Sequence, residues 1–227
     1  MSRSFTVIDA EQRSPAWFAA RAGRLTASVA KDMLSWNKDR RESAARRDLR
    51  MRLVCERLSG RPIEDDYQNA DMRRGIELEP LARTCYMSET GETVNQCGFV
   101  AHNEHLIGCS PDGIIGDFVG GVELKCPRPA NHLAYLRACA LPSEHEPQVL
   151  HSLWVTGAEY WDFVSFCDAF PESLQLFVHR VKHNHTAVRA YAEEALKFLA
   201  EVETEYQAVR TMANPAETLR ASIGGVS

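Results

Sequence analysis

Apolar residues recur every three or four positions in two long stretches of the chain, which is the spacing of one face of an α-helix. They are residues 43–58, with Leu49, Leu53, Val54 and Leu58, and residues 186–212, with Val188, Tyr191, Ala195, Leu199, Val202, Tyr206 and Val209. We therefore predict two helices with apolar faces turned inward, and in the first of them we expect the arginines to face outward. A third long helix is expected over residues 72–90, broken at Gly91.

Shorter helices are indicated by residues typical of helix ends. Ser14-Pro15 predicts a helix start, because serine caps a helix and proline fits its first position. We expect helical structure over residues 11–34, with a break at Gly23 and a second start at Thr26. Two more helices and two loops complete this set: helices over 131–140 and 147–155, and loops over 34–42 and 59–71.

Six short apolar or alternating runs bounded by turn residues predict β-strands. They are residues 98–101, 106–108, 114–115, 122–125, 159–167 and 175–182. Helices and strands alternate along the chain, so the sequence predicts a mixed α/β fold.

Length and composition are typical of a globular protein. The chain has 227 residues, of which 44% are hydrophobic and 25% charged, and we expect one domain over 1–227 with a frayed tail after Pro215. There is no apolar run of membrane-spanning length and no signal-peptide pattern, so we expect a cytoplasmic protein without membrane contact. Seven cysteines with no Cys-x-x-Cys spacing argue for free thiols, against a disulfide framework or a zinc site.

The charge is distributed unevenly. The net charge is −5, yet residues 38–61 hold nine Lys/Arg against four Asp/Glu, so the rest of the chain carries −10. Such a basic stretch either follows a phosphate backbone or forms a solvated helix face with ion pairs along it. The sequence leaves these two interpretations open.

Candidate chemistry lies in residues 108–127. Ser110-Pro111-Asp112-Gly113 predicts a turn into a hairpin, whose return strand would bring Glu123 near Asp112 and place Lys125 on the same face as Glu123. Two neighbouring carboxylates repel unless a cation neutralises them, and oxygen ligands suit Mg²⁺ or Mn²⁺. The alternative is a solvated hairpin with an ordinary Glu/Lys pair on its wet face.

The spacing of these residues resembles that of a known nuclease superfamily. Pro111-Asp112, ten intervening residues and Glu123-x-Lys125 resemble the core motif of the restriction-endonuclease-like PD-(D/E)xK nucleases. The longer string, Ser-Pro-Asp-Gly followed by Glu-Leu-Lys-Cys-Pro, resembles the phage-lambda-type alkaline exonucleases. The signature Gly75-x-x-x-Glu79 also accompanies that core and makes Glu79 the candidate third acid.

A second block resembles the same family. It comprises Trp17, Arg21, Gly23, Thr26, Ala27 and Ser28. The resemblance implies that Arg21 and Ser28, with Ser110, bind the 5′-phosphate of DNA, and that Gln148 points toward the active site from a helix. A guanidinium and hydroxyls at a helix start are suitable phosphate ligands. Taken alone, the block would be a capping serine and a surface arginine.

The resemblance implies a central mixed β-sheet flanked by helices and an active site with two Mg²⁺ ions, for which Mn²⁺ may substitute. The ions would be held by Asp112, Glu123, the Leu124 carbonyl and Glu79, while Lys125 orients the attacking water. The implied activity is processive 5′→3′ digestion of one strand at double-stranded DNA ends, releasing mononucleotides and leaving 3′ single strands for recombination.

The same resemblance implies a ring-shaped homotrimer, a phage-type single-strand annealing protein as partner, and a phage or prophage origin in a bacterial host cell. Where the family carries an acid near the turn at 102–104, this chain has His102. The alternatives are an endonuclease of the same superfamily and a DNA-end-binding module that has lost catalysis.

Overall fold

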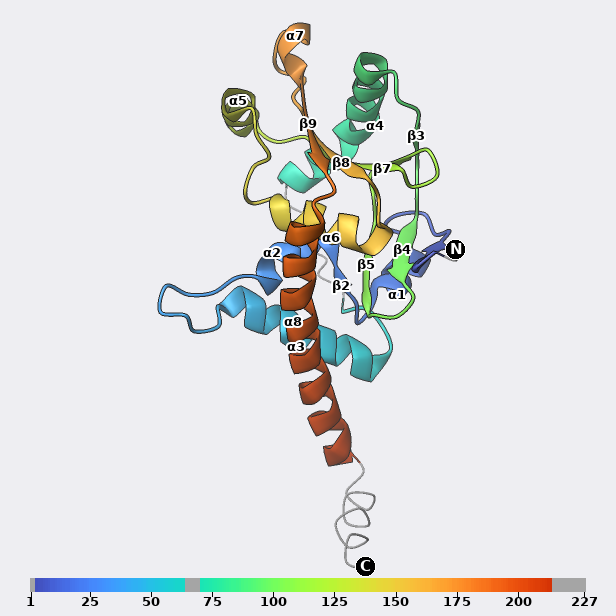
Figure 1. Ribbon diagram of the computed structural model, residues 1–227, viewed down its shortest axis with the longest axis vertical. Coiled ribbons are helices and arrows are strands. Elements are labelled where there is room, and N and C mark those ends of the chain that lie inside the picture. The colour runs from blue at the N-terminus through green and yellow to red at the C-terminus, as the bar shows by residue number, and fades with distance from the viewer. Residues whose placement is uncertain (1–2, 64–69, 214–227) are drawn as a thin grey trace, which may run out of the picture.

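The computed structural model describes residues 3–63 and 70–213, which form two mixed β-sheets with helices packed around them (Figure 1). The first sheet has the strand order β1-β4-β5-β2, with β1 at Phe5–Ile8, β2 at Leu25–Thr26, β4 at Phe99–His102 and β5 at Ile107–Cys109. The second has the order β3-β6-β7-β8-β9, with β3 at Val94–Asn95, β6 at Gly113–Ile115, β7 at Gly120–Lys125, β8 at Tyr160–Phe166 and β9 at Leu176–Lys182. The mixed α/β class is confirmed, although two sheets stand in place of the single central sheet.

The three residues 110–112 carry the chain from the first sheet to the second. They connect β5 directly to β6, which then forms an antiparallel hairpin with β7. Strands β7 and β8 are parallel, so the chain between them must cross over, and it does so through α5 (Pro129–Ala138) and α6 (Glu146–Thr156). The residues that join the two sheets therefore lie beside the central strands of the second one.

Glycine at the start of β7 makes room for a large side chain of β8. A Cβ atom at Gly121 would lie 2.3 Å from the Trp161 ring of β8, well inside van der Waals contact. Trp161 is fully buried, so its ring has no room to move aside. The bare backbone of Gly121 thus lets the Trp161 ring lie across the start of β7.

The helices largely follow the apolar pattern of the sequence. They are α1 (Pro15–Arg21), α2 (Ala30–Met33), α3 (Ala44–Ser59), α4 (Ala70–Thr90), α5, α6, α7 (Glu172–Gln175) and α8 (His185–Ala213). Ser14 caps α1 as predicted, since its Oγ accepts a hydrogen bond from the Trp17 N–H at 3.2 Å. The predicted helix start at Thr26 is wrong: Leu25 and Thr26 pair with β5, and a short 3₁₀ turn, Ala27–Val29, precedes α2.

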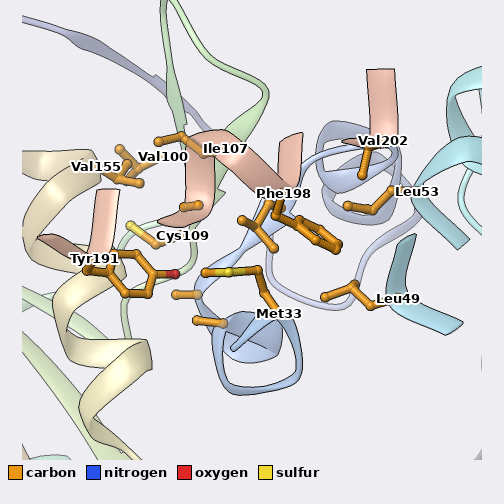
Figure 2. Packing of buried hydrophobic residues seen from close by; sticks show 14 of the residues in the cluster. Met33, Leu49, Leu53, Val100, Ile107, Cys109, Val155, Tyr191, Phe198 and Val202 are labelled. Carbon is orange, nitrogen blue, oxygen red and sulfur yellow. The ribbon is translucent and has the colours of Figure 1, made fainter. Parts of the chain in front are cut away.

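A hydrophobic core joins the first sheet to α3, α6 and α8. Figure 2 shows Phe198 of α8 beside Leu53 and Met33, with Val100 and Ile107 of the sheet nearby. All five residues are buried. The long C-terminal helix predicted over residues 186–212 is therefore an integral part of the core from Tyr191 to Val202.

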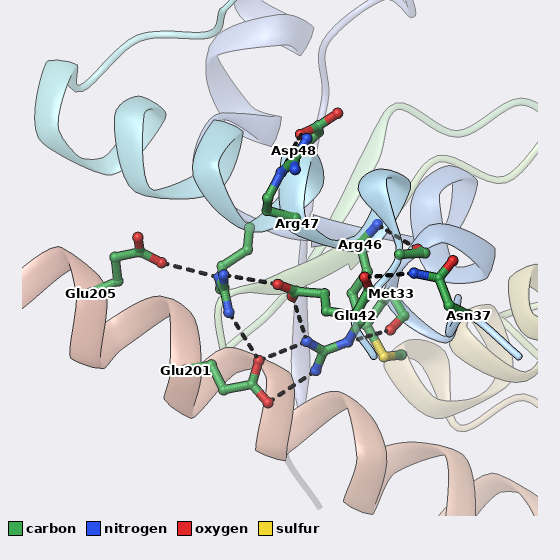
Figure 3. Close-up of polar contacts among 10 residues, drawn as sticks. Met33, Asn37, Glu42, Arg46, Arg47, Asp48, Glu201 and Glu205 are labelled. Carbon is green, nitrogen blue, oxygen red and sulfur yellow. Dashed lines mark hydrogen bonds and ion pairs between the residues drawn. The ribbon is translucent and has the colours of Figure 1, made fainter. Parts of the chain in front are cut away.

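Most arginines of the basic stretch are paired with acids rather than free. Arg46 is buried and donates to Glu42 at 2.8 Å and to both carboxylate oxygens of Glu201 at 2.8 and 3.0 Å, which corrects the expectation that the arginines face outward (Figure 3). Arg50 pairs with Glu42 and Glu205. Leu58, expected inward, is 42% exposed. The contacts favour the ion-paired interpretation of the stretch, with helix α8 supplying half of the acids and the stretch itself the other half.

Three further expectations bear on the whole chain. All seven cysteines are free thiols. In the described ranges 3–63 and 70–213, no helix combines the length and apolarity that a bilayer crossing requires. The expected frayed tail after Pro215 and part of the expected loop over 59–71 lie outside the described residues.

We predict that Arg46→Ala lowers the free energy of unfolding by about 2 kcal/mol, because it removes several hydrogen bonds to charged groups and leaves Glu201 with one weaker partner. The melting temperature should fall by roughly 4–8 °C in calorimetry. Arg47→Ala is the matched control, since Arg47 is an exposed neighbour paired with Asp48, and its loss should change stability by less than about 0.5 kcal/mol. Equal effects of the two substitutions would contradict the assignment of Arg46 to the core.

Candidate active site

The β6–β7 hairpin brings Asp112 against the strand that carries Glu123 and Lys125. Gly113 is paired with Val122, and the Asp112 N–H donates to the Val122 carbonyl at 3.2 Å. The Leu124 N–H in turn donates to Asp112 Oδ2 at 2.7 Å. The aspartate is therefore held by β7 itself, through a main-chain acceptor on one side of Glu123, the Val122 carbonyl, and a main-chain donor on the other, the Leu124 N–H.

Glu123 is buried and its carboxylate is oriented by two donors. Lys125 Nζ and Gln148 Nε2 each donate to Glu123 Oε1 at 2.6 Å. Gln148 belongs to α6, so the glutamine predicted to point toward the site does so. Burial of Glu123 also speaks against a hairpin with a solvated Glu/Lys pair.

The electrostatics of this cluster show a shortage of positive charge. Burial, together with the nearby Glu123 and Glu79 carboxylates, raises the pKa of Asp112 well above its ordinary value, although Lys125 opposes the effect. Burial acts to lower the pKa of Lys125, but the attraction of Glu123 and Asp112 outweighs it and the pKa is raised. Lys125 thus stays protonated and balances only one of the two carboxylates.

The donor set fits a divalent cation that keeps part of its water shell. Among residues 3–63 and 70–213, Asp112 Oδ1 and Glu123 Oε2 accept no hydrogen bond, so each carboxylate has a free oxygen. No group of three His, Cys, Asp or Glu side chains in that part of the chain could hold a metal by itself. Mg²⁺ usually binds one or two carboxylates together with water and substrate phosphate, so two carboxylates and the adjacent Leu124 carbonyl suit it better than a closed protein cage would.

Glu79 lies beside this cluster on α4, but arginines occupy both of its oxygens. Arg83 donates to Oε1 at 2.6 Å and Arg13 to Oε2 at 3.3 Å. Arg83 also donates to the main-chain carbonyl of Asp112 at 3.2 Å. The candidate third acid therefore faces the cleft as predicted while being ion-paired.

The fold also brings together Arg21, Ser28 and Ser110, although Arg21 and Ser110 are 89 residues apart along the chain. The Arg21 guanidinium donates to Ser110 Oγ at 3.1 Å and to Ser28 Oγ at 3.1 Å. Trp17 donates to Ser110 from its indole nitrogen at 2.8 Å, and Arg21 stacks on the Trp17 ring with 4.1 Å from Cζ to the centroid. A rigid guanidinium surrounded by hydroxyls is thus in place before any ligand binds.

A second arginine makes this pocket more positive than the sequence motif indicates. Burial and the proximity of Arg52 lower the pKa of Arg21 to about 10. Arg52 comes from α3, and its Nε is buried with no hydrogen-bond partner in the described part of the chain. Two close guanidinium groups with an unused donor favour binding of an anion. From the sequence, Arg52 is only one of the charges in the basic stretch, because nothing in a single sequence places α3 beside α1.

One cleft connects the two sets of residues. It has a volume of about 690 Å³ and extends from Trp17 and Ser28, past Asp112, Glu123 and Lys125, to further lining residues on the other side, Asn131, Tyr135 and His145. The arginine pocket, of about 470 Å³, adjoins it and shares Ser28. His102, in contrast, lines neither cleft and accepts hydrogen bonds from the N–H groups of Glu104 and His105.

Comparison with known proteins identifies relatives. The model of the YqaJ-like viral recombinase domain matches residues 16–159. The crystal structure of an alkaline exonuclease from Laribacter hongkongensis, LHK-Exo, superimposes with a TM-score of 0.79 at 35% identity, covering 88% of this chain and 98% of the other, and so does LHK-Exo in complex with dAMP. A phage related exonuclease from Haemophilus somnus 129PT shares the fold, with a TM-score of 0.61 at 14% identity over 83% of this chain and 96% of that one. No protein with a curated description is significantly similar in sequence.

We predict that Asp112→Asn stabilises the cation-free protein at neutral pH. Because the folded chain holds a proton on Asp112 more tightly than the unfolded chain does, its stability falls as the pH rises from the ordinary aspartate range through the raised pKa. The neutral amide of asparagine removes this loss of stability, and its oxygen can still accept the hydrogen bond from the Leu124 N–H. In EDTA the melting temperature should rise by roughly 2–4 °C near pH 7, and the gain should shrink in acid.

Mg²⁺ or Mn²⁺ should raise the melting temperature of the unaltered protein but not of Asp112→Asn, because binding stabilises only the form that holds the ligand. Asp117→Asn is the control, since Asp117 lies in the same hairpin with its side chain 85% exposed. A lower melting temperature for Asp112→Asn in EDTA would show that the hydrogen bond from Leu124 to the charged carboxylate outweighs the cost of burial and repulsion.

Proposed function

The chain belongs to the YqaJ-like viral recombinase domain family and is a deoxyribonuclease, and we propose that it digests one strand of linear double-stranded DNA in the 5′→3′ direction. It would start from a 5′-phosphorylated end, release mononucleotides and leave 3′ single strands for recombination. The observation that carries the proposal is the shared cleft: the carboxylates that can hold a cation and the arginine pocket that can hold an anion lie within one continuous binding surface.

The carboxylates would bind the divalent cations. Asp112, Glu123 and the Leu124 carbonyl are the proposed ligands of Mg²⁺, with Mn²⁺ as a substitute and two ions per site. When bound, such ions activate water and stabilise the charge on the phosphate and the leaving 3′-oxygen. Glu79 would join through a water molecule, because Arg83 already holds one of its oxygens.

The remaining side chains prepare the attack. Lys125 is protonated and lies 2.6 Å from Glu123, so its other N–H bonds can position the attacking water against the phosphate. Gln148 donates to the same Glu123 oxygen from helix α6, which helps to keep the carboxylate in one rotamer. Neither group needs to change its charge for these roles.

The arginine pocket would determine where the cut falls. With a terminal 5′-phosphate bound by Arg21, Ser28 and Ser110, and Arg52 adding charge, the next phosphate along the strand reaches the carboxylates through the shared cleft. Hydrolysis there releases one nucleotide and creates a new 5′-phosphate. An end-binding pocket of this kind favours an exonuclease over an endonuclease of the same superfamily, which has no need of a terminal phosphate.

Assembly and partners are proposed from the family resemblance alone. We expect a homotrimeric ring around the DNA, a phage-type single-strand annealing protein as partner, and action in the cytoplasm of a bacterial host. The residues proposed for the site all come from this one chain. The mass in solution from light scattering tests the trimer.

A linear and a closed circular duplex, each incubated with Mg²⁺, test the activity. We expect the linear DNA alone to be digested, because only it offers a terminal phosphate. Cutting of the circle would assign an endonuclease, and survival of both would assign a binding module. Lys125→Ala is the matched control: it should abolish digestion, since the water loses its positioning group, while DNA binding in a gel-shift assay stays near normal.

We predict that Arg21→Ala slows digestion of 5′-phosphorylated ends far more than that of 5′-hydroxyl ends. Loss of a charge-assisted contact to the terminal phosphate should cost about 2–3 kcal/mol, or about 30- to 150-fold in kcat/KM. Arg52→Ala should act in the same direction with a smaller effect, and Arg47→Ala should have none. An equal slowing of both kinds of end by Arg21→Ala would remove the phosphate pocket from the mechanism.

A further inference from the structure

Arg13 has an unusual backbone conformation for its residue type. Its φ is +71°, and in the described part of the chain only Arg40, Phe118 and Cys139 among the non-glycine residues also have positive φ. A side chain that carries a Cβ atom is strained in this left-handed region, and such strain persists only where the surroundings enforce it. The conformation belongs to a β-turn: the Ser14 N–H donates to the Glu11 carbonyl at 3.0 Å, and Arg13 is the third residue of that turn, where glycine or asparagine is the usual residue. The choice of arginine at this position, at the edge of an active-site cleft, is what calls for an explanation.

The neighbours of Arg13 enforce the conformation. Gln12 donates from Nε2 to the carbonyls of Pro111 and Cys97, at 2.9 and 3.2 Å, and so ties this segment to the residues next to Asp112. On the other side, Ser14 caps helix α1. The backbone of Arg13 is thereby fixed between two anchored residues, while its side chain remains 44% exposed.

Arg13 lies where the clefts meet. It lines the arginine pocket that contains Arg21, the active-site cleft that contains Asp112, and a third, polar cleft of about 330 Å³ behind Glu79. Arg13 is therefore at the boundary between the cleft that holds the carboxylates and the arginine pocket.

The two arginines that contact Glu79 form hydrogen bonds of different strength. Arg83 is 12% exposed and donates at 2.6 Å, whereas the half-exposed Arg13 donates at 3.3 Å, near the limit of a hydrogen bond. Removing Arg13 from Glu79 would leave that carboxylate still neutralised by Arg83. Arg13 is thus the exchangeable partner, and a phosphate oxygen is a better acceptor for a guanidinium than a carboxylate already shared with Arg83.

We propose that Arg13 is a positioning residue for translocation, which rests on the proposed exonuclease function. After each cut, the new 5′-phosphate lies at Asp112 and Glu123 and must reach Arg21 before the next cut. Arg13 leaves Glu79, binds this phosphate at the boundary of the two clefts and passes it to the arginine pocket. Its left-handed backbone is the conformation that aims the side chain at this boundary.

The experiment that tests this role measures the rate at which each successive nucleotide is released. A 5′-phosphorylated duplex with a 3′ label on the digested strand is bound to excess protein in EDTA, Mg²⁺ is added, and the ladder of products is resolved over time. For Arg13→Gly we expect release of the first nucleotide within about threefold of the unaltered rate, because the terminal phosphate is already bound by Arg21, and every later step slower by about tenfold or more.

The controls separate this role from a structural one. Glycine and asparagine tolerate positive φ, so Arg13→Gly and Arg13→Asn should melt at or above the unaltered temperature and share the stepping defect. Arg40→Gly changes the same residue type at the same kind of φ, away from the clefts, and should step normally. The inference is overturned if Arg13→Gly steps at the unaltered rate, if its first and later steps slow equally, or if Arg40→Gly shows the same defect. If the unaltered protein releases no nucleotides, the proposed function itself fails.

Discussion

The main-chain hydrogen bond from Leu124 to Asp112 is the contact on which the site depends. It places one carboxylate against another in a buried position, an arrangement that costs free energy in the absence of a cation. The neighbours limit this cost without removing it: Lys125 and Gln148 hold Glu123, and Arg83 holds Glu79. The folded chain thus retains a local excess of negative charge that a divalent ion can neutralise.

The position of the site follows from the change of sheet at residues 110–112. Ser110, at the end of one sheet, faces the arginine pocket, and Asp112, at the start of the next, faces the carboxylate cluster. If residues 110–112 continued one strand, Ser110 and Asp112 would point to the same face of the sheet, because alternate residues of a strand do so. The crossing therefore supplies a residue to the candidate cation site and another to the candidate anion site from one short segment.

Local spacing in the sequence accounts for most of what could be predicted. The hairpin that joins Asp112 to Glu123 and the caps and stops of the helices are short-range features, and the apolar periodicity of α3 and α8 has one dominant interpretation. Strand β1 and the roles of Arg52 and Arg13 could not be predicted, because they depend on contacts between distant segments. The pairing of Arg46 with Glu201 spans 155 residues, and no periodicity in a single sequence encodes it.

The acids of α8 also bear on how the protein would meet a duplex in the proposed function. Since Glu201 and Glu205 already neutralise Arg46 and Arg50, these two arginines are not available to displace condensed counterions from a phosphate backbone. They would therefore add little to the salt dependence of binding. Electrostatic attraction would instead be concentrated where Arg21 and Arg52 lie, so it would act on the termini of a strand more than on the interior of a duplex.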